Sequence, residues 1–150
     1  MTAPIRFLAI AALLGAMLIA AGCGEDRSTP TLTGQAWVWT SFATSAPGSE
    51  TVVPNPERYT IEFADDGTFS AKVDCNQVGG TYTTADGGAM TIVPGPSTTA
   101  ACPADSLGND FLQGLSGTTA YDITDKQLSL SRADGGTLTL DPQSASASPS

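Results

Sequence analysis

Residues 59–73 read Tyr59-Thr60-Ile61-Glu62-Phe63-Ala64-Asp65-Asp66-Gly67-Thr68-Phe69-Ser70-Ala71-Lys72-Val73, and the fold class can be inferred from them. Apolar and polar residues alternate on both sides of Asp65-Asp66-Gly67, as they do in strands that have one buried and one solvated face. Aspartate tolerates left-handed backbone and glycine adopts positive φ without strain, so this central sequence is typical of a hairpin turn. The stretch therefore predicts two antiparallel strands joined by a tight turn.

The same alternation and the same turn chemistry recur outward from this hairpin. Leucines alternate with polar residues in two later runs, and Asp-Gly-Gly sequences stand at residues 86–88 and 134–136. The remaining expected strands cover residues 35–42, 80–84, 89–93, 120–124, 127–131 and 137–140. Together these features predict a mainly β (α+β) fold, namely a small antiparallel β-sheet or barrel-like domain with one short helix.

The expected helix follows Pro103, where the two-residue period stops. The apolar residues that share one helical face recur at every fourth position and are Leu107, Phe111 and Leu115. Asp105 or Ser106 could cap the free amides at the start of the helix. Gly108 and Gly114 each weaken a helix by about 1 kcal/mol relative to alanine, so we expect docking of the apolar face to stabilise it.

The N-terminal residues have the pattern of an export signal that ends at a cysteine. Arg6 is the only charged residue among residues 1–22, an apolar run covers residues 7–19, and small residues lead into Cys23. As a helix this run would cover roughly 20 Å, whereas a bilayer core is ~30 Å thick, which favours a cleaved signal over a permanent span. We expect Cys23 to become a lipidated N-terminus. The alternative is a plain secretory signal that leaves Cys23 as a free thiol.

Composition divides the mature chain into three parts. Residues 23–30 are polar and lack an apolar period, so they are expected to form a tether. Residues 142–150 are too poor in large apolar residues to order themselves and are expected to form a disordered tail. The folded domain is therefore expected to span residues 31–141, and we expect it to be a monomer held at the extracytoplasmic face of the cell membrane by the lipid on Cys23.

Charge and composition exclude several functional classes. The chain carries a formal net charge of −9 and has no histidine. Such a surface repels phosphate backbones and anionic lipid headgroups, so no nucleic-acid partner is expected. Without histidine there can be no Ser/His/Asp or Cys/His nucleophilic triad and no zinc site of the Cys/His type. No cofactor, no metal and no catalytic residue are predicted.

If Cys23 carries a lipid, Cys75 and Cys102 are left as a pair. In an oxidising compartment the expected state of such a pair is a disulfide. The bond would close a loop of about 28 residues and stabilise the fold by roughly 3–4 kcal/mol on the chain-entropy model. Two buried thiols or a metal-binding pair are the alternatives.

Two further sequences depart from a plain strand pattern. Residues 74–82 read Asp74-Cys75-Asn76-Gln77-Val78-Gly79-Gly80-Thr81-Tyr82, and residues 98–103 read Thr98-Thr99-Ala100-Ala101-Cys102-Pro103. Asn76 can hydrogen-bond loop backbone, the Gly79-Gly80 pair permits a sharp re-entry, and Tyr82 returns the chain to the core.

These sequences follow Gly34-Gln35-Ala36-Trp37 and the Tyr-x-Ile-x-Phe strand, and they precede the helix and the two leucine-bearing strands. This order, over residues 32–140, resembles the META domain family, whose bacterial members include heat-shock-inducible HslJ-like proteins. The residues that match the family pattern are Trp37, Cys75, Asn76, Gly80, Tyr82 and Cys102. The resemblance implies a small antiparallel β domain with one helix, often exported and lipid-anchored, with no established catalytic activity. It also implies that some relatives are linked to stress tolerance, antibiotic resistance or virulence, without a shared ligand.

Other side chains have two possible roles each. Trp37 and Trp39 lie two residues apart and therefore on one strand face, where core packing is expected and a surface platform for sugar or peptide is the alternative. Asn76 with Gln77 could line a small polar pocket, although a loop-stabilising role is expected. The aspartates of the turn signals are expected to serve the turns, because no series of calcium ligands follows them.

Carboxylate pairs offer the main route to catalysis. Glu57 with Glu62, or Asp74 with Asp66, could be proposed as a pair for glycoside cleavage. Their positions on polar strand faces or at turns favour simple solvation instead.

The function predicted from the sequence is therefore that of a cell-envelope lipoprotein. Its META-like domain is expected to be a non-enzymatic binding or stress-protective module for an unknown envelope ligand or protein. The alternatives are a carboxylate-dependent envelope hydrolase and an enzyme inhibitor that presents the proline-stiffened loop of residues 41–56 to a cleft.

Overall fold

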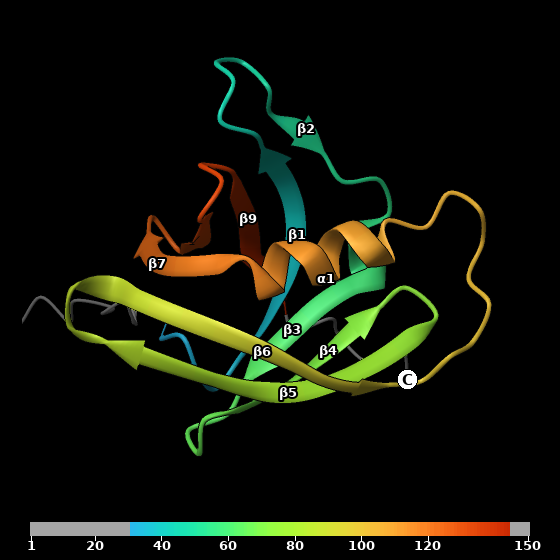
Figure 1. Ribbon diagram of the computed structural model, residues 1–150, viewed down its shortest axis with the longest axis horizontal. Coiled ribbons are helices and arrows are strands. Elements are labelled where there is room, and N and C mark those ends of the chain that lie inside the picture. The colour runs from blue at the N-terminus through green and yellow to red at the C-terminus, as the bar shows by residue number, and fades with distance from the viewer. Residues whose placement is uncertain (1–30, 145–150) are drawn as a thin grey trace, which may run out of the picture.

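The computed structural model describes residues 31–144 (Figure 1). The predicted signal peptide, Cys23, the tether and residues 145–150 of the predicted tail lie outside the described residues. The strands are β1 (Ala36–Ala43), β2 (Thr51–Val52), β3 (Tyr59–Phe63), β4 (Thr68–Val73), β5 (Asn76–Ala85), β6 (Ala89–Ser97), β7 (Thr118–Thr124), β8 (Gln127–Arg132) and β9 (Thr137–Pro142). The helices are α1 (Gly108–Ser116) and two single 3-10 turns, η1 (Pro56–Arg58) and η2 (Asp86–Gly88).

The strands form one antiparallel sheet that closes into a barrel. Their order is β2-β1-β3-β4-β5-β6-β7-β8-β9, and β1 also pairs with β9. The closing pairing runs from Trp37 opposite Pro142 to Ala43 opposite Thr137. The predicted Asp-Gly turns join β3 to β4, β5 to β6 and β8 to β9. The prediction of a mainly β fold with one short helix is confirmed.

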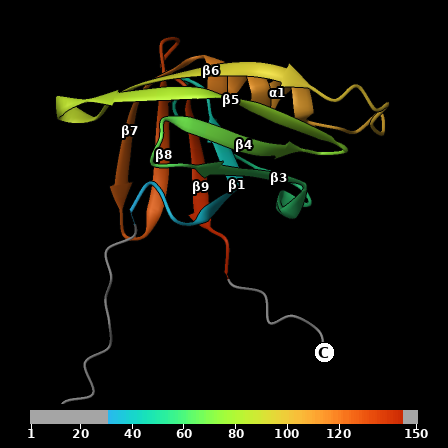
Figure 2. The same ribbon diagram turned by 90° about the horizontal axis from the view of Figure 1, so that it is seen from below.

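The barrel is least continuous between β6 and β7, which share only the pairing of Ala89 with Ala120. Helix α1 packs against β6 (Figure 2). A Cβ atom on Gly114 would lie 2.5 Å from a methyl carbon of Leu138, and one on Gly108 would lie 3.1 Å from a methyl carbon of Val73. The two glycines that weaken the isolated helix therefore permit its close docking on the sheet.

The helix begins at Gly108, one or two residues later than a cap at Asp105 or Ser106 would give. The N-cap residue is Leu107, and the Ser106 hydroxyl, one residue earlier, accepts a hydrogen bond from the Gly108 N–H at 3.2 Å. Asp105 instead lies 3.9 Å from a guanidinium nitrogen of Arg58. No helix within residues 31–144 has the length and apolar character needed to cross a bilayer.

The core fills the barrel with the inward residues of the alternating strands and with two residues of α1. The largest fully buried side chains are Trp37, Trp39, Tyr59, Ile61, Phe63, Ile92, Phe111, Leu115, Leu128, Leu130, Leu138 and Leu140. Trp37 and Trp39 are 0% and 1% exposed. Core packing of both tryptophans is therefore confirmed, and the alternative of a surface aromatic platform is wrong.

Residues 41–56 are more ordered than the sequence suggests. Ser41 and Phe42 belong to β1, where they pair with the two residues of β2. The backbone N–H of Val53 donates to the Thr40 carbonyl at 2.9 Å, and the Val53 side chain is only 2% exposed. The free loop is therefore limited to residues 44–50, because an apolar residue after it is drawn into the core.

The turn between β7 and β8 lies in the two-residue gap between the strands expected at 120–124 and 127–131, but it carries no glycine. Asp125 and Lys126 both adopt positive φ, at 53° and 69°. Positive φ at both central residues gives a two-residue hairpin turn whose twist matches that of the flanking strands. A lysine adopts such an angle at some cost in conformational energy.

Candidate functional site

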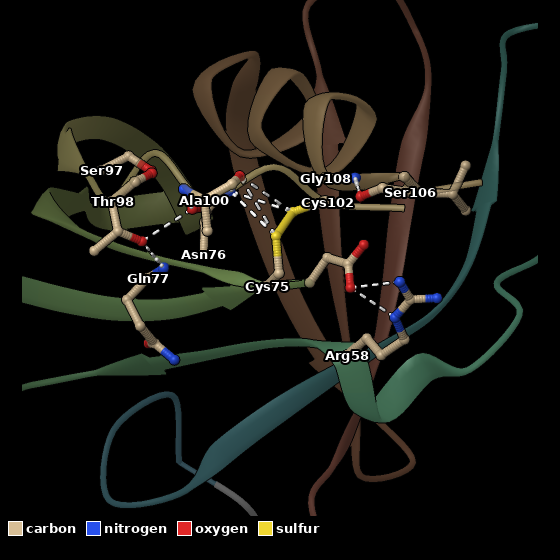
Figure 3. Close-up of a disulfide and its surroundings, with 12 residues drawn as sticks. Arg58, Cys75, Asn76, Gln77, Ser97, Thr98, Ala100, Cys102, Ser106 and Gly108 are labelled. Atoms are coloured by element: carbon tan, nitrogen blue, oxygen red, sulfur yellow. Dashed lines mark hydrogen bonds and ion pairs between the residues drawn. A yellow bond between two sulfur atoms is a disulfide. The ribbon is translucent and has the colours of Figure 1, made fainter. Parts of the chain in front are cut away.

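A disulfide joins Cys75 to Cys102, whose Cα atoms are 5.5 Å apart (Figure 3). Cys75 lies in the turn between β4 and β5, and Cys102 lies in the segment between β6 and α1. Cys75 is exposed and Cys102 is half-buried, so the bridge is at the surface. The bond confirms the predicted pairing and excludes the alternatives of two buried thiols or a metal-binding pair. It attaches residues 98–107, which form no strand or helix, to the sheet.

Asn76 holds the same segment through its side-chain amide (Figure 3). Its Oδ1 accepts hydrogen bonds from the Ala100 N–H at 2.8 Å and from the Thr98 hydroxyl at 3.0 Å. Its Nδ2 donates to the Ala100 carbonyl at 3.1 Å and lies 3.2 Å from the Cys102 sulfur. Because both ends of the amide are engaged, the loop-stabilising role expected for Asn76 agrees with the structure.

A cleft of about 480 Å³ opens beside the bridge, and we call it the disulfide cleft. Its polar lining comes chiefly from Asn76, Ser97, Thr98, Thr99, Ser106 and Asn109. No charged side chain is among the described residues that line it. The cleft can therefore offer hydrogen bonds to a neutral ligand, but it presents no carboxylate or lysine for general acid–base chemistry.

An ion pair that the sequence did not indicate lies close to the disulfide. Arg58 at the end of η1 approaches Asp74 Oδ1 at 2.6 Å through one guanidinium nitrogen and at 2.7 Å through Nε. The Asp74 side chain is only 5% exposed, so the expectation that it is solvated is wrong. The backbone N–H of Asp74 also donates to the Arg58 carbonyl at 2.7 Å, which fixes the two residues side by side.

The electrostatics of this pair follow from its contacts. The Ser106 hydroxyl and the Arg58 guanidinium lower the pKa of Asp74, against the opposing effect of burial. Asp74 Oδ2 nevertheless has no hydrogen bond of good geometry with any described residue, so the Arg58 contact is the firmer of the two. The hydrogen bond to Asp74 in turn raises the pKa of Arg58.

Gly80 and Tyr82 serve packing. A Cβ atom on Gly80 would collide with the Val93 carbonyl oxygen and lie 2.5 Å from an edge carbon of the Phe69 ring. Tyr82 packs edge-on against Phe63, with ring centroids 4.9 Å apart, and its hydroxyl donates to the Ala64 carbonyl at 2.7 Å. Burial raises the pKa of Tyr82. Both residues therefore hold β5 against the neighbouring strands.

The other carboxylates are not arranged as a catalytic pair. Asp66 and Asp74 stand at opposite ends of β4, roughly 20 Å apart at the usual rise per strand residue, whereas glycosidase carboxylates lie about 5–9.5 Å apart. Asp66 Oδ1 accepts hydrogen bonds from the Thr68 hydroxyl at 2.6 Å and from the Thr68 N–H at 3.0 Å, which lower the pKa of Asp66. Glu57 and Glu62 are exposed, on η1 and β3. Among residues 31–144, no group of three or more potential ligands is placed to hold a metal ion.

Comparison with known proteins agrees with this architecture. The model of the META domain family matches residues 30–145. A solved structure of a protein from Burkholderia xenovorans is 21% identical, with a TM-score of 0.62, and the match covers 90% of this chain and 99% of that one. A DUF4847 family protein from Bacteroides vulgatus is 16% identical, with a TM-score of 0.56, over 73% of this chain and 93% of that one. Both likenesses concern the fold alone. No curated protein matches the chain.

Proposed function

Because this chain belongs to the META domain family, a family not known for enzymes, we propose that it is a cell-envelope lipoprotein. In this proposal Cys23 carries the lipid and the β domain of residues 31–141 is a non-enzymatic binding or stress-protective module. The domain is displayed on the extracytoplasmic face of the cell membrane, and the tether and lipid attach it there.

The disulfide is the observation that carries the proposal. Cys75 is exposed, and an exposed disulfide persists in an oxidising compartment but is rare in the cytosol. The bridge therefore supports the hypothesis that the chain is exported. Export agrees with the interpretation of residues 1–22, which directly precede Cys23, as a signal peptide.

The non-enzymatic part of the proposal is supported by how the polar groups of the family pattern are used. The Trp37 indole donates to the Leu32 carbonyl at 2.9 Å, the Tyr82 hydroxyl donates to a backbone carbonyl, and the Asn76 amide is engaged at both ends. Groups that are committed to internal hydrogen bonds stabilise the fold and are not free to act on a substrate.

Metabolic labelling tests the anchorage. Cells that express the full chain are grown with radiolabelled palmitate, and the label should enter the polypeptide and be lost in Cys23→Ser. The matched control makes the same substitution at the other two cysteines, and the double variant Cys75→Ser with Cys102→Ser should keep the label. Label that persists in Cys23→Ser, or that never enters the wild-type chain, contradicts the proposal.

Substrate assays separate the hydrolase alternative from the proposed function. The purified chain is incubated with envelope glycans and peptides, and each acidic residue is then replaced in turn. Turnover that one acidic substitution abolishes would establish the hydrolase. Unchanged substrates would count against the hydrolase.

A further inference from the structure

A second cleft lies between α1, the end of β1 and the turn from β8 to β9, and we call it the α1 cleft. Its volume is about 270 Å³, which corresponds to roughly nine water molecules at ~30 Å³ each. A cleft of this size accepts one sugar ring or one amino-acid residue. The lining side chains that matter below are Trp39, Phe42, Asp110, Gln113, Arg132 and Asp134.

Two residues that line this cleft each carry a hydrogen-bond donor that has no acceptor among the described residues. Trp39 Nε1 and Arg132 Nε are both buried, and neither makes a hydrogen bond to any described residue. Buried donors in folded proteins are nearly always paired, so two orphans in one cleft require an explanation. Trp37 provides the contrast on the same strand, because its indole N–H donates to the Leu32 carbonyl at 2.9 Å. The two indoles of β1 therefore differ, since that of Trp37 is paired and that of Trp39, which lines the cleft, is not.

The charges around the cleft restrict what could supply the acceptor. Arg132 is already paired with Asp134, at 2.8 Å between a guanidinium nitrogen and a carboxylate oxygen. Asp110 on α1 adds a second carboxylate to the lining, which leaves the wall with an excess of negative charge. An anionic ligand would be repelled by these carboxylates. These charges favour an uncharged oxygen as the acceptor.

A secondary amide group meets both requirements of the cleft, because it is uncharged and it carries an oxygen that can accept a hydrogen bond. Its carbonyl oxygen has two lone pairs, so it has the capacity to accept from Trp39 Nε1, from Arg132 Nε or from both. Its N–H can donate to the Asp110 carboxylate or to the Gln113 side chain, both of which face the cleft from α1. Its apolar substituent can pack on Phe42, which is half-buried and lies 5.4 Å from the Trp39 ring between centroids.

We propose that the α1 cleft binds a compact, uncharged ligand through a secondary amide group. The Phe42 ring and the Arg132 side chain, which is 30% exposed, shift to let the carbonyl oxygen reach the two donors. The amide can come from an N-acetylated sugar or from a peptide. This inference deepens the proposed function and rests on its binding role, for which it names the ligand chemistry and the site.

Proton–nitrogen NMR of the ¹⁵N-labelled full chain in detergent tests the inference directly. The chain has two tryptophans, so its spectrum holds two indole signals, and Trp37 is an internal control. The amide probes are N-acetylglucosamine and N-acetylalanine methylamide, and the probes without an amide are glucose and acetate. We expect an amide probe to shift the Trp39 indole proton downfield and to leave that of Trp37 in place. The amide probe that shifts the Trp39 signal at the lower concentration shows whether the amide comes from an N-acetylated sugar or from a peptide.

Variants show whether the contacts are the ones proposed. Arg132→Lys keeps the positive charge but removes Nε, and it should weaken binding of the amide probe roughly tenfold, the loss typical of one hydrogen bond. Asp110→Asn should also weaken binding, whereas Glu62→Gln, a matched loss of charge on the exposed face of β3, should not. Trp39→Phe should abolish the response. If Trp39→Phe does not fold, binding of the amide probe to Arg132→Lys tests the proposed contacts.

Several results would overturn the inference. These are no shift of the Trp39 signal at tens of millimolar probe, equal shifts of both indoles, equal binding of glucose or acetate, or full binding by Arg132→Lys. None of them affects palmitate labelling at Cys23, so failure of the ligand inference is distinguishable from failure of the proposed anchorage.

Discussion

The indole ring of Trp39 on β1 lies nearly parallel to the phenyl ring of Phe111 on α1, with centroids 5.0 Å apart and 14° between the planes. Tyr59 on β3 meets both rings edge-on, at 5.6 and 6.0 Å. This three-ring cluster joins the helix to β1 and β3, and it helps to hold α1, which has little intrinsic stability of its own.

Replacement of Phe111 should therefore detach the helix. We expect Phe111→Ala to lower the free energy of unfolding by about 3–5 kcal/mol, since it removes a fully buried ring and leaves a cavity. Chemical denaturation followed by tryptophan fluorescence measures the change. Leu112→Ala, on the half-buried face of the same helix, is the control and should cost much less. Similar losses for the two variants would show that the ring cluster does not dominate.

Adjacent glycines in β5 give a matched pair. Gly80→Ala should destabilise the fold by about 1–3 kcal/mol, because the added methyl group meets backbone as well as the Phe69 ring. At Gly79 the nearest atom to an added Cβ is the Phe69 carbonyl oxygen, at 3.8 Å, so Gly79→Ala should be nearly neutral. Thermal melts of both variants provide the comparison, and equal melting temperatures would contradict the close approach at Gly80.

Loss of the bridge should destabilise the domain without changing its fold. Cys75→Ser with Cys102→Ser should lower stability by roughly 3–4 kcal/mol on the chain-entropy model. The Asn76 contacts with Ala100 and Thr98 remain available to hold the segment, so the circular dichroism of the sheet should persist. Mass spectrometry of the unreduced wild-type chain should show no alkylatable thiol at Cys75 or Cys102. Alkylation at either position in freshly exported protein would contradict the bridge.

Acid should weaken the Arg58–Asp74 ion pair. The pKa of Asp74 is lower in the folded state than in the unfolded chain, so the pair contributes stability above the unfolded pKa of about 4. That contribution is lost as pH falls through the folded pKa. We expect Asp74→Asn to lower stability at pH 7 and to flatten the dependence of stability on pH below about 4. Asp66→Asn is the comparison variant, because hydrogen bonds from Thr68 likewise lower the pKa of Asp66. If the stability of Asp74→Asn fell below about pH 4 as steeply as that of the wild-type chain, the result would count against the ion pair.

The strands were predictable because the two-residue period is a local signal. The hairpin from Tyr59 to Val73 and the Asp-Gly turns could be located from neighbouring residues alone. Closure of the barrel could not, because the partners that close it, such as Trp37 and Pro142, are far apart in the sequence. The short strand β2 was missed for a different reason, because its two residues are too few to show an alternating pattern.

The site was predictable only in part. The pairing of Cys75 with Cys102 follows from the number of cysteines, and the role of Asn76 follows from its place beside one of them. Burial of Asp74 depends on Arg58, which lies 16 residues away and draws the carboxylate into an ion pair. The α1 cleft is not visible in the sequence, because an indole or guanidinium without an acceptor is recognised only when the surrounding residues have been placed.

The antiparallel alignment of β1 with β9 gives the barrel two distinct poles. Trp37 and Pro142, beside the points where the described chain begins and ends, mark one pole, and Ala43 and Thr137 mark the other. The six residue steps from Trp37 to Ala43 in β1 separate the poles by about 20 Å. The α1 cleft is lined by Ala43 and Gly136 and therefore opens at the second pole. In a chain fastened to a bilayer ahead of residue 31, this cleft would thus lie at the pole farther from the attachment, accessible to molecules that approach from beyond the lipid surface.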